Sequence, residues 1–453
     1  MDFAGKNVLV VGLGQSGAAV ARWLSGQGAH VTVSEKRDES DLDTGVITGL
    51  SGTGIHVECG GHRIETFTKS DLIVVSPGVP LDIRPLTEAR IKGVPVSGEI
   101  ELAGGHLKTR AVAVTGTNGK STVVKLIGDM LHKGGSSVFV GANFGPPLAE
   151  YVGGDQRADY AVLELSSFQL DTIETFSPLM ALILNVSPDH LDRYKDYDAY
   201  AGSKQRIFAN QGKGQTLILN DDDLWLRGLK PKNGPAVFRY GLDRVVGRHA
   251  FLDNETITVR LPGRKEVRFS LERFALPGNH NRSNLMAAIL TALLLEMAPP
   301  DIQEVIDHFE GLPHRLELVE EIEGVAFYND SKATNIDAAI KSITSFSRPI
   351  ILIAGGTHKG SDYHPLIEAA THQVKGAVFL GEARDLLAEA SADTIPWTMA
   401  TDMGDAVSLA YKQANRGDVV LLAPACSSFD MFRNFQHRGV VFREAVKRLK
   451  NGA

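Results

Sequence analysis

The chain has 453 residues, too many for one ordinary hydrophobic core, so two to four domains are expected. Hydrophobic residues make up 43% and charged residues 22% of the sequence, which is the composition of a water-exposed globular protein. The net charge of -7 excludes a protein that binds nucleic acid through a basic stripe. Such an acidic chain must bind anions locally, with helix N-termini and a few lysines or arginines.

The two cysteines, Cys59 and Cys426, form neither a disulfide framework nor a zinc-binding pattern, so we expect a cytosolic protein and treat Cys426 as a buried thiol. The first residues, MDFAGKNVLVV, enter a strand directly and lack the layout of a signal peptide. The longest apolar run, LMAAILTALLL at 285–295, is shorter than the ~20 residues of a membrane span. It predicts a buried helix over 285–297 and no membrane span.

Apolar strand-like runs alternate with helix-like stretches along the chain, which predicts α/β domains on parallel sheets. The pattern begins with NVLVVG, restarts near residue 98 with RAVAVTG, and restarts again near residue 312 with VAFYND. A polar stretch at 213–275 contains short β-like pieces such as TITVRL. We therefore predict three domains, residues 1–98, 99–311 and 312–453.

The first glycine-rich motif, GLGQSG at residues 12–17, fits the pattern G-x-G-x-x-G after a strand. Glycine lets the backbone approach a phosphate, and the following helix offers free N–H groups. Glu35, after the next strand, lies where an acid that binds a ribose is expected. The motif predicts a nucleotide or diphosphate ligand without identifying NAD, and a ligand-free turn stays an alternative.

The second glycine-rich motif, TGTNGKST at residues 115–122, predicts a P-loop more specifically. In a P-loop, backbone N–H groups hold phosphates, a lysine (here Lys120) reaches the β and γ oxygens, and a hydroxyl (here Ser121) binds Mg²⁺. Val114 occupies the position of the first glycine in the usual pattern. The strand before the motif and the helix-like STVVKLIGDML after it support the interpretation.

Polar residues follow other strands of the middle domain. Glu164 ends the run YAVLE, where a carboxylate is placed to hold Mg²⁺, although a solvated acid is the alternative. His190 stands between Asp189 and Asp192 in NVSPDHLDRY, which suits a ligand or proton carrier. Lys204, in AGSKQRIF, has by its pattern alone the features of a solvated helix residue.

Three polar clusters follow strands of the last domain. They are YNDSKATN (328–335), GGTHKGSDY (355–363) and PACSSFDMFRNF (424–435). Each alone could be an ordinary polar loop. Because the carboxyl ends of parallel strands meet at one edge of a sheet, the three together predict a site for a polar substrate.

Together these motifs resemble those of the Mur ligases over essentially the whole chain. The motifs TGTNGKST, ELSSFQL, NVSPDHLDRY and GNHNRSN are similar to those of the ATP-dependent superfamily. The motifs GLPHR, NDSKATN, AGGTHKG and PACSSFDMF resemble the D-glutamate-adding branch. The resemblance implies an N-terminal Rossmann-like domain that binds the UDP end of the substrate, a central P-loop ATPase-like domain and a C-terminal Rossmann-like domain that binds the amino acid.

The resemblance also implies the reaction and its ligands. It implies a cytoplasmic ligase of peptidoglycan precursor synthesis that joins D-glutamate to UDP-N-acetylmuramoyl-L-alanine through an acyl phosphate and a tetrahedral intermediate. ATP and two Mg²⁺ ions are the implied cofactors. We expect a monomer without nucleic-acid partners, and a hinge near residue 312 that closes the third domain over the site.

The site residues that the resemblance implies fall into four sets. The UDP-substrate set is Gln15, Ser16, Glu35, Lys36, Arg37, Gly78, Asn143 and Ser166; Glu35 stands where the family usually has aspartate, and Lys36 replaces a small hydroxyl residue. The ATP set is Gly116, Thr117, Asn118, Gly119, Lys120, Ser121, Thr122, Asn281, Asn284, Arg315 and Asp330. The Mg²⁺ set is Ser121, Glu164, His190 and Lys204, the last as a carbamate. The catalytic set is Lys120, Glu164, His190 and Lys204. The D-glutamate set is Thr334, Lys359, Ser428 and Phe435.

Three alternatives stay open at this point. A sibling ligase could add L-alanine, a diamino acid or a dipeptide, or extend folate with glutamate, although NDSKATN disfavours these. An NAD-dependent oxidoreductase would explain GLGQSG and Glu35 but not the P-loop, Glu164 or His190. A non-enzymatic P-loop module would bind ATP without turning it over.

Overall fold

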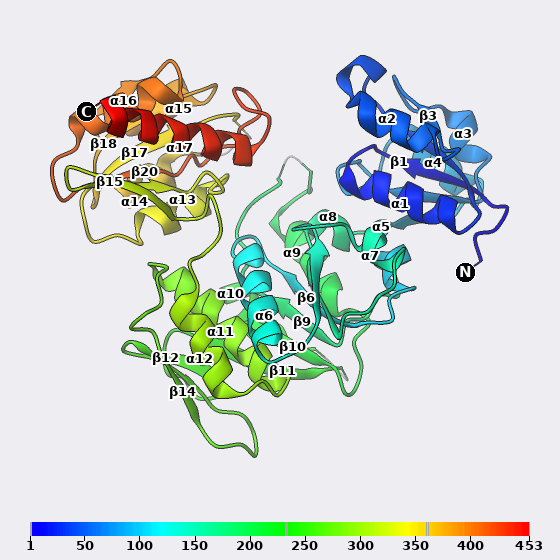
Figure 1. The fold of residues 1–453 in the computed structure, drawn as a ribbon, viewed down its shortest axis with the longest axis horizontal. Helices are drawn as coiled ribbons and strands as arrows, with labels where there is room; N and C mark the ends of the chain where they lie inside the picture. The colour runs from blue at the N-terminus through cyan, green and yellow to red at the C-terminus, as the bar shows by residue number, and fades with distance from the viewer. Residues whose placement is uncertain are drawn as a thin grey trace.

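The computed structural model describes residues 2–191, 193–231, 234–358, 360, 362–392 and 394–452. Asp192 and Lys359, which the sequence analysis singled out, lie outside these residues. The described strands form three separate sheets, and each sheet has its own helices (Figure 1). This architecture confirms the predicted fold class of three α/β domains, which we call the first, middle and third units.

The first unit contains a parallel sheet with the order β3-β2-β1-β4-β5. Its strands are β1 (Asn7–Val11), β2 (His30–Ser34), β3 (His56–Glu58), β4 (Leu72–Val75) and β5 (Val96–Gly98). Its helices are α1 (Gln15–Gly26), α2 (Thr44–Ser51), α3 (Ile64–Thr68) and α4 (Arg84–Ile91), with a 3-10 turn at Glu39–Asp41. The chain leaves β1 at the point where the strand order reverses, and ligands of such sheets bind beside this point.

The turn after β1 requires two of its glycines. Gly12 has a φ of 92°, which favours glycine. A Cβ on Gly17 would lie 2.0 Å from the carbonyl oxygen of Gly12. The GLGQSG motif therefore lets α1 pack directly on the end of β1.

The middle unit has a nine-stranded sheet with the order β14-β13-β12-β11-β10-β9-β6-β8-β7. Its strands are β6 (Arg110–Thr115), β7 (Val138–Ala142), β8 (Tyr160–Glu164), β9 (Met180–Ile183), β10 (Thr216–Asn220), β11 (Ala236–Gly241), β12 (Ala250–Asp253), β13 (Thr256–Val259) and β14 (Val267–Ser270). Its helices are α5 (Glu99–Gly104), α6 (Lys120–Lys133), α7 (Leu148–Val152), α8 (Ser167–Leu170), α9 (Tyr197–Gln205), α10 (Leu224–Arg227), α11 (Asn279–Leu294) and α12 (Pro299–His308), with a 3-10 turn at Arg206–Phe208. The polar stretch at 213–275 thus extends the same sheet, ending in an antiparallel meander of β12, β13 and β14. The helix predicted over 285–297 is α11, which already begins at Asn279 and is buried as expected.

The third unit has a sheet with the order β15-β16-β20-β17-β18-β19. Its strands are β15 (Glu317–Ile322), β16 (Val325–Asn329), β17 (Ile350–Gly355), β18 (Val374–Leu380), β19 (Trp397–Met399) and β20 (Val419–Leu422). Its helices are α13 (Ile336–Ile343), α14 (His364–Ala370), α15 (Arg384–Ser391), α16 (Met403–Gln413) and α17 (Phe435–Gly452). The sequence analysis missed the edge strands β15 and β19, because ELVEEI is largely charged and WTM is very short.

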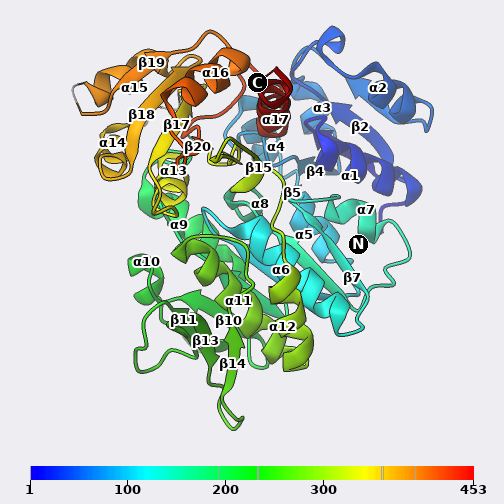
Figure 2. The ribbon, with the colours of Figure 1, turned by 60° about the vertical axis from the view of Figure 1, so that its left-hand side comes forward.

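The first and third units both lie above the middle unit in two views turned by 60° (Figures 1 and 2). Helix α13 is on the side of the third unit that faces the middle unit. Among the described helices, none is both long and apolar enough to cross a membrane.

The join between the first and middle units is tightly packed at Gly98. A Cβ on this residue, the last of β5, would lie 1.9 Å from the Oγ1 of Thr172. Thr172 is itself held, since its hydroxyl donates to the carbonyl of Gln169 at 3.2 Å. Within the middle unit, the Glu101 carboxylate of α5 accepts from the backbone N–H groups of residues 174–176. The close contact at Gly98 thus fixes the end of β5 against the middle unit.

We expect Gly98→Ala to lower the free energy of unfolding by about 1–3 kcal/mol, because the added methyl group must displace Thr172. Thermal unfolding followed by circular dichroism measures the change. Gly26→Ala is the matched control: a Cβ there meets open space at the end of α1, so its melting temperature should be unchanged or higher. Equal melting temperatures for Gly98→Ala and wild type would contradict the tight join.

Candidate functional site

A cavity of about 450 Å³ lies between the three units. The first unit contributes Pro77 and Gly78, and the middle unit contributes the P-loop together with the ends of β8 and β9. The third unit contributes the segment after β16. The predicted site residues that line this cavity are Gly78, Thr117, Asn118, Gly119, Lys120, Thr122, Asn143, Glu164, Ser166, His190, Lys204, Asn281, Asn284, Arg315, Asp330 and Thr334. A second cavity of about 710 Å³ adjoins it and shares Asn118, Gly119, His280, Asn284 and Lys341.

The P-loop has the predicted strand–loop–helix form, between β6 and α6. Gly116 and Gly119 have φ values of 157° and 87°, so the turn favours glycine at both positions. The Nζ of Lys120 donates to the carbonyl oxygens of Gly116 and Thr117, at 2.8 and 2.9 Å. The lysine thus lies along its own loop, and its ammonium group is at the cavity wall.

Glu164 ends β8 and is only 2% exposed. Its Oε2 accepts from the Ser121 hydroxyl at 2.5 Å, and its Oε1 accepts from the Asn143 amide at 2.6 Å. Burial alone would raise the pKa of Glu164, but the charge of Lys120 and these hydrogen bonds hold the pKa below its usual value. The carboxylate is therefore ionised at neutral pH, and the alternative of a solvated surface acid is wrong.

Lys204 is buried, so the prediction of a solvated helix residue from its pattern alone is wrong. Its side chain is 1% exposed, lies over the ring of Tyr200 and donates to the carbonyl oxygen of Gly116 at 3.0 Å. Burial, together with the charge of Lys120, lowers the pKa of Lys204 far below its usual value. The sequence signal that indicates burial is the apolar pair Ile207 and Phe208, which packs in the core directly after α9.

Arg315 connects the third unit to the P-loop. Its Nη2 donates to the Ser121 hydroxyl at 2.7 Å, and Ser121 in turn donates to Glu164. Burial lowers the pKa of Arg315, although a guanidinium remains charged at neutral pH. The structure therefore brings together the predicted residues of two units at one hydroxyl group.

His190 follows β9 with a φ of 55° and lines the same cavity. Its Nε2 is 3.9 Å from the Asp189 carboxylate, and its ring packs on Phe168 with centroids 4.7 Å apart. The same carboxylate oxygen, Oδ2 of Asp189, accepts from the Asn335 amide of the third unit at 3.0 Å. The loop that carries His190 is thus in contact with the third unit.

The side chains of the cavity suit a Mg²⁺ ion that is coordinated partly by the protein and partly by phosphate oxygens. Among the described residues, no three His, Cys, Asp or Glu side chains converge on one point. The described part of the cavity instead offers the ionised carboxylate of Glu164, which accepts from the Ser121 hydroxyl, together with the side chains of Asp189, His190 and Lys204. Mg²⁺ in proteins is commonly held by one or two carboxylates plus substrate phosphates, so these residues fit the ion.

Glu35 lies beneath the first glycine-rich loop and is 6% exposed. Its Oε2 accepts from the backbone N–H of Leu13 at 2.7 Å, and its Oε1 accepts from Arg37 Nε at 3.0 Å. Burial alone would raise the pKa of Glu35, but the hydrogen bonds from Arg37 and Leu13 lower the pKa to about 2. Glu35 therefore braces the loop, and its contact with UDP stays a prediction.

The remaining residues predicted to bind UDP surround this loop. Gln15, Lys36 and Arg37 are exposed at the carboxyl ends of β1 and β2, and Ser16 is half-buried at the start of α1. None of these residues lines the cavity between the units, whereas Gly78, Asn143 and Ser166 do. The predicted set thus extends from the outer loop of the first unit into the shared cavity.

Not all of the residues predicted to bind D-glutamate line the shared cavity. Thr334 lines the cavity, whereas Ser428 is buried and Phe435 begins α17. The Phe435 ring lies 4.2 Å from the Nζ of Lys332, a cavity residue. The buried Cys426 confirms the expectation of a buried thiol, and its Sγ lies 3.1 Å from the Tyr363 hydroxyl.

The sequence analysis missed Arg438, which is 1% exposed. Its guanidinium donates to the carbonyl oxygens of Ser331, Cys426 and Ser427, and at 3.5 Å to that of Gly355, and so ties together all three polar loops of the third unit. Burial lowers its pKa to about 10. An arginine in a polar helix gives no sequence signal of burial.

Three further residues of the predicted ATP set line the shared cavity from two units. Asn281 and Asn284 are on α11, and burial raises the pKa of Asp330, which directly follows β16, to about 6. The sequence analysis did not single out His280, which is also on α11 and lines both cavities. Burial and the charge of Lys341 lower the pKa of His280 to about 4, so the imidazole is neutral at neutral pH.

Three family models match the chain in succession. They are a Mur ligase MurD-like N-terminal domain over residues 6–98, a Mur ligase middle domain over 114–292 and a Mur ligase glutamate ligase domain over 314–426. Each matched range corresponds to one of the three sheets.

The chain is similar over its whole length to proteins that are named as the same ligase. The UDP-N-acetylmuramoylalanine–D-glutamate ligase of Geotalea uraniireducens is 42% identical over 453 residues, covering 100% of both chains. The ligase of the same name from Acidobacterium capsulatum is 44% identical over 448 residues, covering 98% of this chain and 97% of its own. Among solved structures, the UDP-N-acetylmuramate–alanine ligase of Thermotoga maritima has the same fold, with a TM-score of 0.62 at 18% identity over 99% of this chain and 100% of that one.

We expect Glu35→Gln to lower the free energy of unfolding at pH 7 by about 2 kcal/mol, because it weakens the charged hydrogen bonds to Leu13 and Arg37. The folded-state pKa is about 2 against an ordinary 4.5, so the ionised form stabilises the fold above pH 4.5. This stabilisation is lost as the pH falls from 4.5 toward 2. The difference between variant and wild type should therefore shrink over this range in denaturant titrations.

Glu39→Gln, at an exposed acid in the same segment, is the control and should change stability little. A difference between Glu35→Gln and wild type that stays constant down to the lowest pH would contradict the role of the carboxylate.

Proposed function

The chain belongs to the Mur ligase family, and from this premise we propose that it joins the amino group of D-glutamate to the alanyl carboxyl group of UDP-N-acetylmuramoyl-L-alanine, converting ATP to ADP and phosphate. The observation that carries the proposal is the whole-length identity to ligases of that specificity. The shared cavity supports it, because a P-loop lysine, a buried carboxylate and residues of all three units meet there.

Family membership disfavours the alternatives from other classes. An NAD-dependent oxidoreductase would explain the first glycine-rich loop but not the P-loop, the buried Glu164 or His190 in the shared cavity. A module that only binds ATP would not need a cavity that continues from the P-loop to the polar loops of two other units. A sibling amino acid remains the alternative that the assay below must exclude.

The first chemical step activates the alanyl carboxylate. A carboxylate is a poor electrophile, so the γ-phosphoryl group of ATP is transferred to one of its oxygens, which forms the acyl phosphate and releases ADP. Lys120 lies where it can neutralise charge that gathers between the two anions, and Arg315 adds a second cation beside Ser121. Mg²⁺, when held by Ser121, Glu164, His190 and the carbamate of Lys204, supplies further neutralisation of the phosphate charge.

The second step forms the amide. The amine of D-glutamate attacks the acyl carbon, a C–N bond forms through a tetrahedral intermediate, the C–O bond to phosphate breaks, and phosphate leaves with the electron pair. Thr334, Ser428, Phe435 and Lys359 are proposed to hold D-glutamate from the third unit. Because water also attacks acyl phosphates, the third unit must cover the site during this step.

The environment of Lys204 supports the proposed carbamate. A lysine amine reacts with CO₂ only when it is neutral, and a buried lysine loses its proton more readily. The nitrogen of the neutral amine bonds to the carbon of CO₂ and one proton is released, so a neutral group becomes an anion; counted from the ammonium form, two protons are lost. The carbamate would add a second carboxylate to the cavity that Glu164 also lines, which suits a second Mg²⁺.

The decisive experiment mixes the protein, ATP, Mg²⁺ and UDP-N-acetylmuramoyl-L-alanine with D-glutamate, L-glutamate, L-alanine or a diamino acid. Phosphate release and amide formation are measured together. We expect D-glutamate alone to give both products in equal amounts. Turnover with a different amino acid would favour a sibling ligase, and no turnover with any would contradict the proposed function.

In this assay we expect Lys120→Ala to lower kcat by about 100-fold or more, because it removes the buried cation beside the phosphates. Lys125→Ala is the matched control: Lys125 lies on the same helix α6, pairs with Asp129 and is partly exposed, so its kcat should stay within about twofold of wild type. Near-normal turnover by Lys120→Ala would exclude the P-loop assignment.

We expect protein incubated with ¹³C-bicarbonate to show a carbamate carbonyl signal in its NMR spectrum. The signal should be missing in Lys204→Arg, which keeps a positive charge but cannot bind CO₂. The same variant should lower kcat by about 100-fold, because a cation replaces an anion near the phosphates. An identical spectrum for both proteins would show that Lys204 is unmodified.

A further inference from the structure

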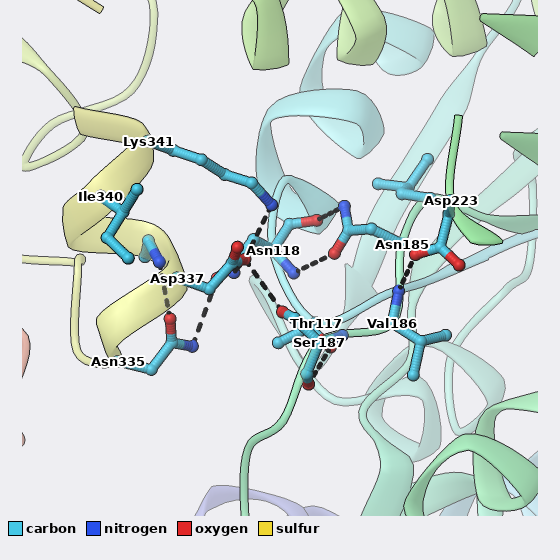
Figure 3. A network of polar contacts seen from close by, with 12 residues as sticks. Thr117, Asn118, Asn185, Val186, Ser187, Asp223, Asn335, Asp337, Ile340 and Lys341 are labelled. Carbon is cyan, nitrogen blue, oxygen red and sulfur yellow. Dashed lines mark hydrogen bonds and ion pairs between the residues drawn. The ribbon is translucent and has the colours of Figure 1, made fainter. Parts of the chain in front are cut away.

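One carboxylate oxygen connects the third unit to two loops of the middle unit. The Oδ2 of Asp337, in the first turn of α13, accepts from the Asn118 amide at 2.7 Å and from the Ser187 hydroxyl at 2.9 Å (Figure 3). Lys341, one turn further along α13, donates to the same oxygen at 2.7 Å. Asn118 belongs to the P-loop, and Ser187 belongs to the loop that carries His190.

The two loops of the middle unit form a cross-bonded platform for this contact. The Asn118 backbone N–H donates to the Asn185 side chain, whose amide donates back to the Asn118 carbonyl, both at 2.9 Å. The Ser187 N–H donates to the Thr117 hydroxyl at 3.0 Å. Asp223 anchors the second loop by accepting from the Val186 N–H at 2.7 Å, as Figure 3 also shows. The donors that meet Asp337 are therefore held in fixed positions.

The helix that carries Asp337 begins directly at the D-glutamate loop. Asn335, the N-cap of α13, accepts from the Ala338 N–H at 2.8 Å and so starts the helix. Its amide simultaneously donates to Asp189 of the middle unit at 3.0 Å. Thr334, proposed to bind D-glutamate, is the preceding residue. Any shift of Asp337 relative to the P-loop therefore moves Thr334 relative to the phosphates.

We propose that Asp337 is a positioning residue for amide formation, which holds the D-glutamate loop in register with the P-loop so that the amine reaches the acyl phosphate before water does. The proposal rests on the proposed function and deepens it. Asp337 does not touch the reacting atoms. It acts through its contacts with Asn118 and Ser187 and through the start of α13.

A simpler explanation is that Asp337 only stabilises the N-terminus of its own helix, where an acid interacts favourably with the helix dipole. This explanation accounts for a carboxylate in the first turn. It also accounts for the ion pair with Lys341, four residues further along α13, but it does not account for two donors from another unit at one oxygen. The two explanations differ in what happens to the ratio of phosphate to amide.

The test measures phosphate released and amide formed by Asp337→Ala in the complete assay with D-glutamate. We expect wild type to release about one phosphate per amide. In Asp337→Ala we expect kcat for the amide to fall by about 10- to 100-fold, since small displacements of reacting groups have such effects. The KM for D-glutamate should rise, and the ratio of phosphate to amide should exceed one. The KM for the UDP substrate should stay unchanged.

Asp385→Ala is the matched control, because Asp385 lies in the first turn of α15 on the same unit and is exposed. It should keep a ratio of one and kcat within about twofold of wild type. Ser187→Ala removes one donor while leaving α13 intact. It should shift the ratio in the same direction as Asp337→Ala, by a smaller amount, and it provides the test if Asp337→Ala does not fold.

A phosphate-to-amide ratio of one in both variants, with kcat equal to the control, would overturn the positioning role. Wild-type protein that forms no amide with D-glutamate would instead contradict the proposed function. In that event small-angle scattering tests the role of Asp337 independently of the reaction. A larger radius of gyration for Asp337→Ala than for wild type would support a role of Asp337 in holding the units together, and equal radii would contradict that role.

Discussion

Buried charged groups dominate the cavity between the three units. The basic groups of Lys120, Lys204 and Arg315 lie near Ser121 and Gly116, where the buried carboxylate of Glu164 accepts from Ser121. Burial lowers the pKa of each of these basic groups, because a charge is less stable there than in water. The site is therefore built to bind anions, and a polyphosphate together with a substrate carboxylate would supply them.

The fold concentrates these charges because its sheets are parallel. Loops at the carboxyl ends of β6, β8 and β9 carry the P-loop lysine, the buried glutamate and the histidine to one edge of the middle sheet. Helix α9 then brings Lys204 to the same edge, and the segment after α12 brings Arg315. The glycines of the P-loop allow the backbone to turn tightly enough for Lys120 to reach its own loop carbonyls.

Local sequence patterns predicted the fold well and the site in part. Apolar runs identify the central strands because strands buried on both faces must be apolar, and the same rule misses β15 and β19 at the sheet edge. The P-loop, Glu164 and His190 could be predicted because each lies at the carboxyl end of a strand or in the loop after it. The pattern around Lys204 misled, since burial of a lysine depends on packing between α9 and the P-loop, which are far apart in sequence. For the same reason no pattern indicates the burial of Arg438 or the convergence of Asn118 and Ser187 on Asp337.

The shared cavity is lined by loops from three different sheets. Under the proposed function, each ligand is therefore recognised mainly by a different unit. The P-loop and the loops after β16, β17 and β20 are on different sheets, so under the proposed function substitutions in those three loops would alter the choice of amino acid while the phosphate-binding turn stays intact. Such a change of specificity would still require the third unit to dock on Asn118 and Ser187.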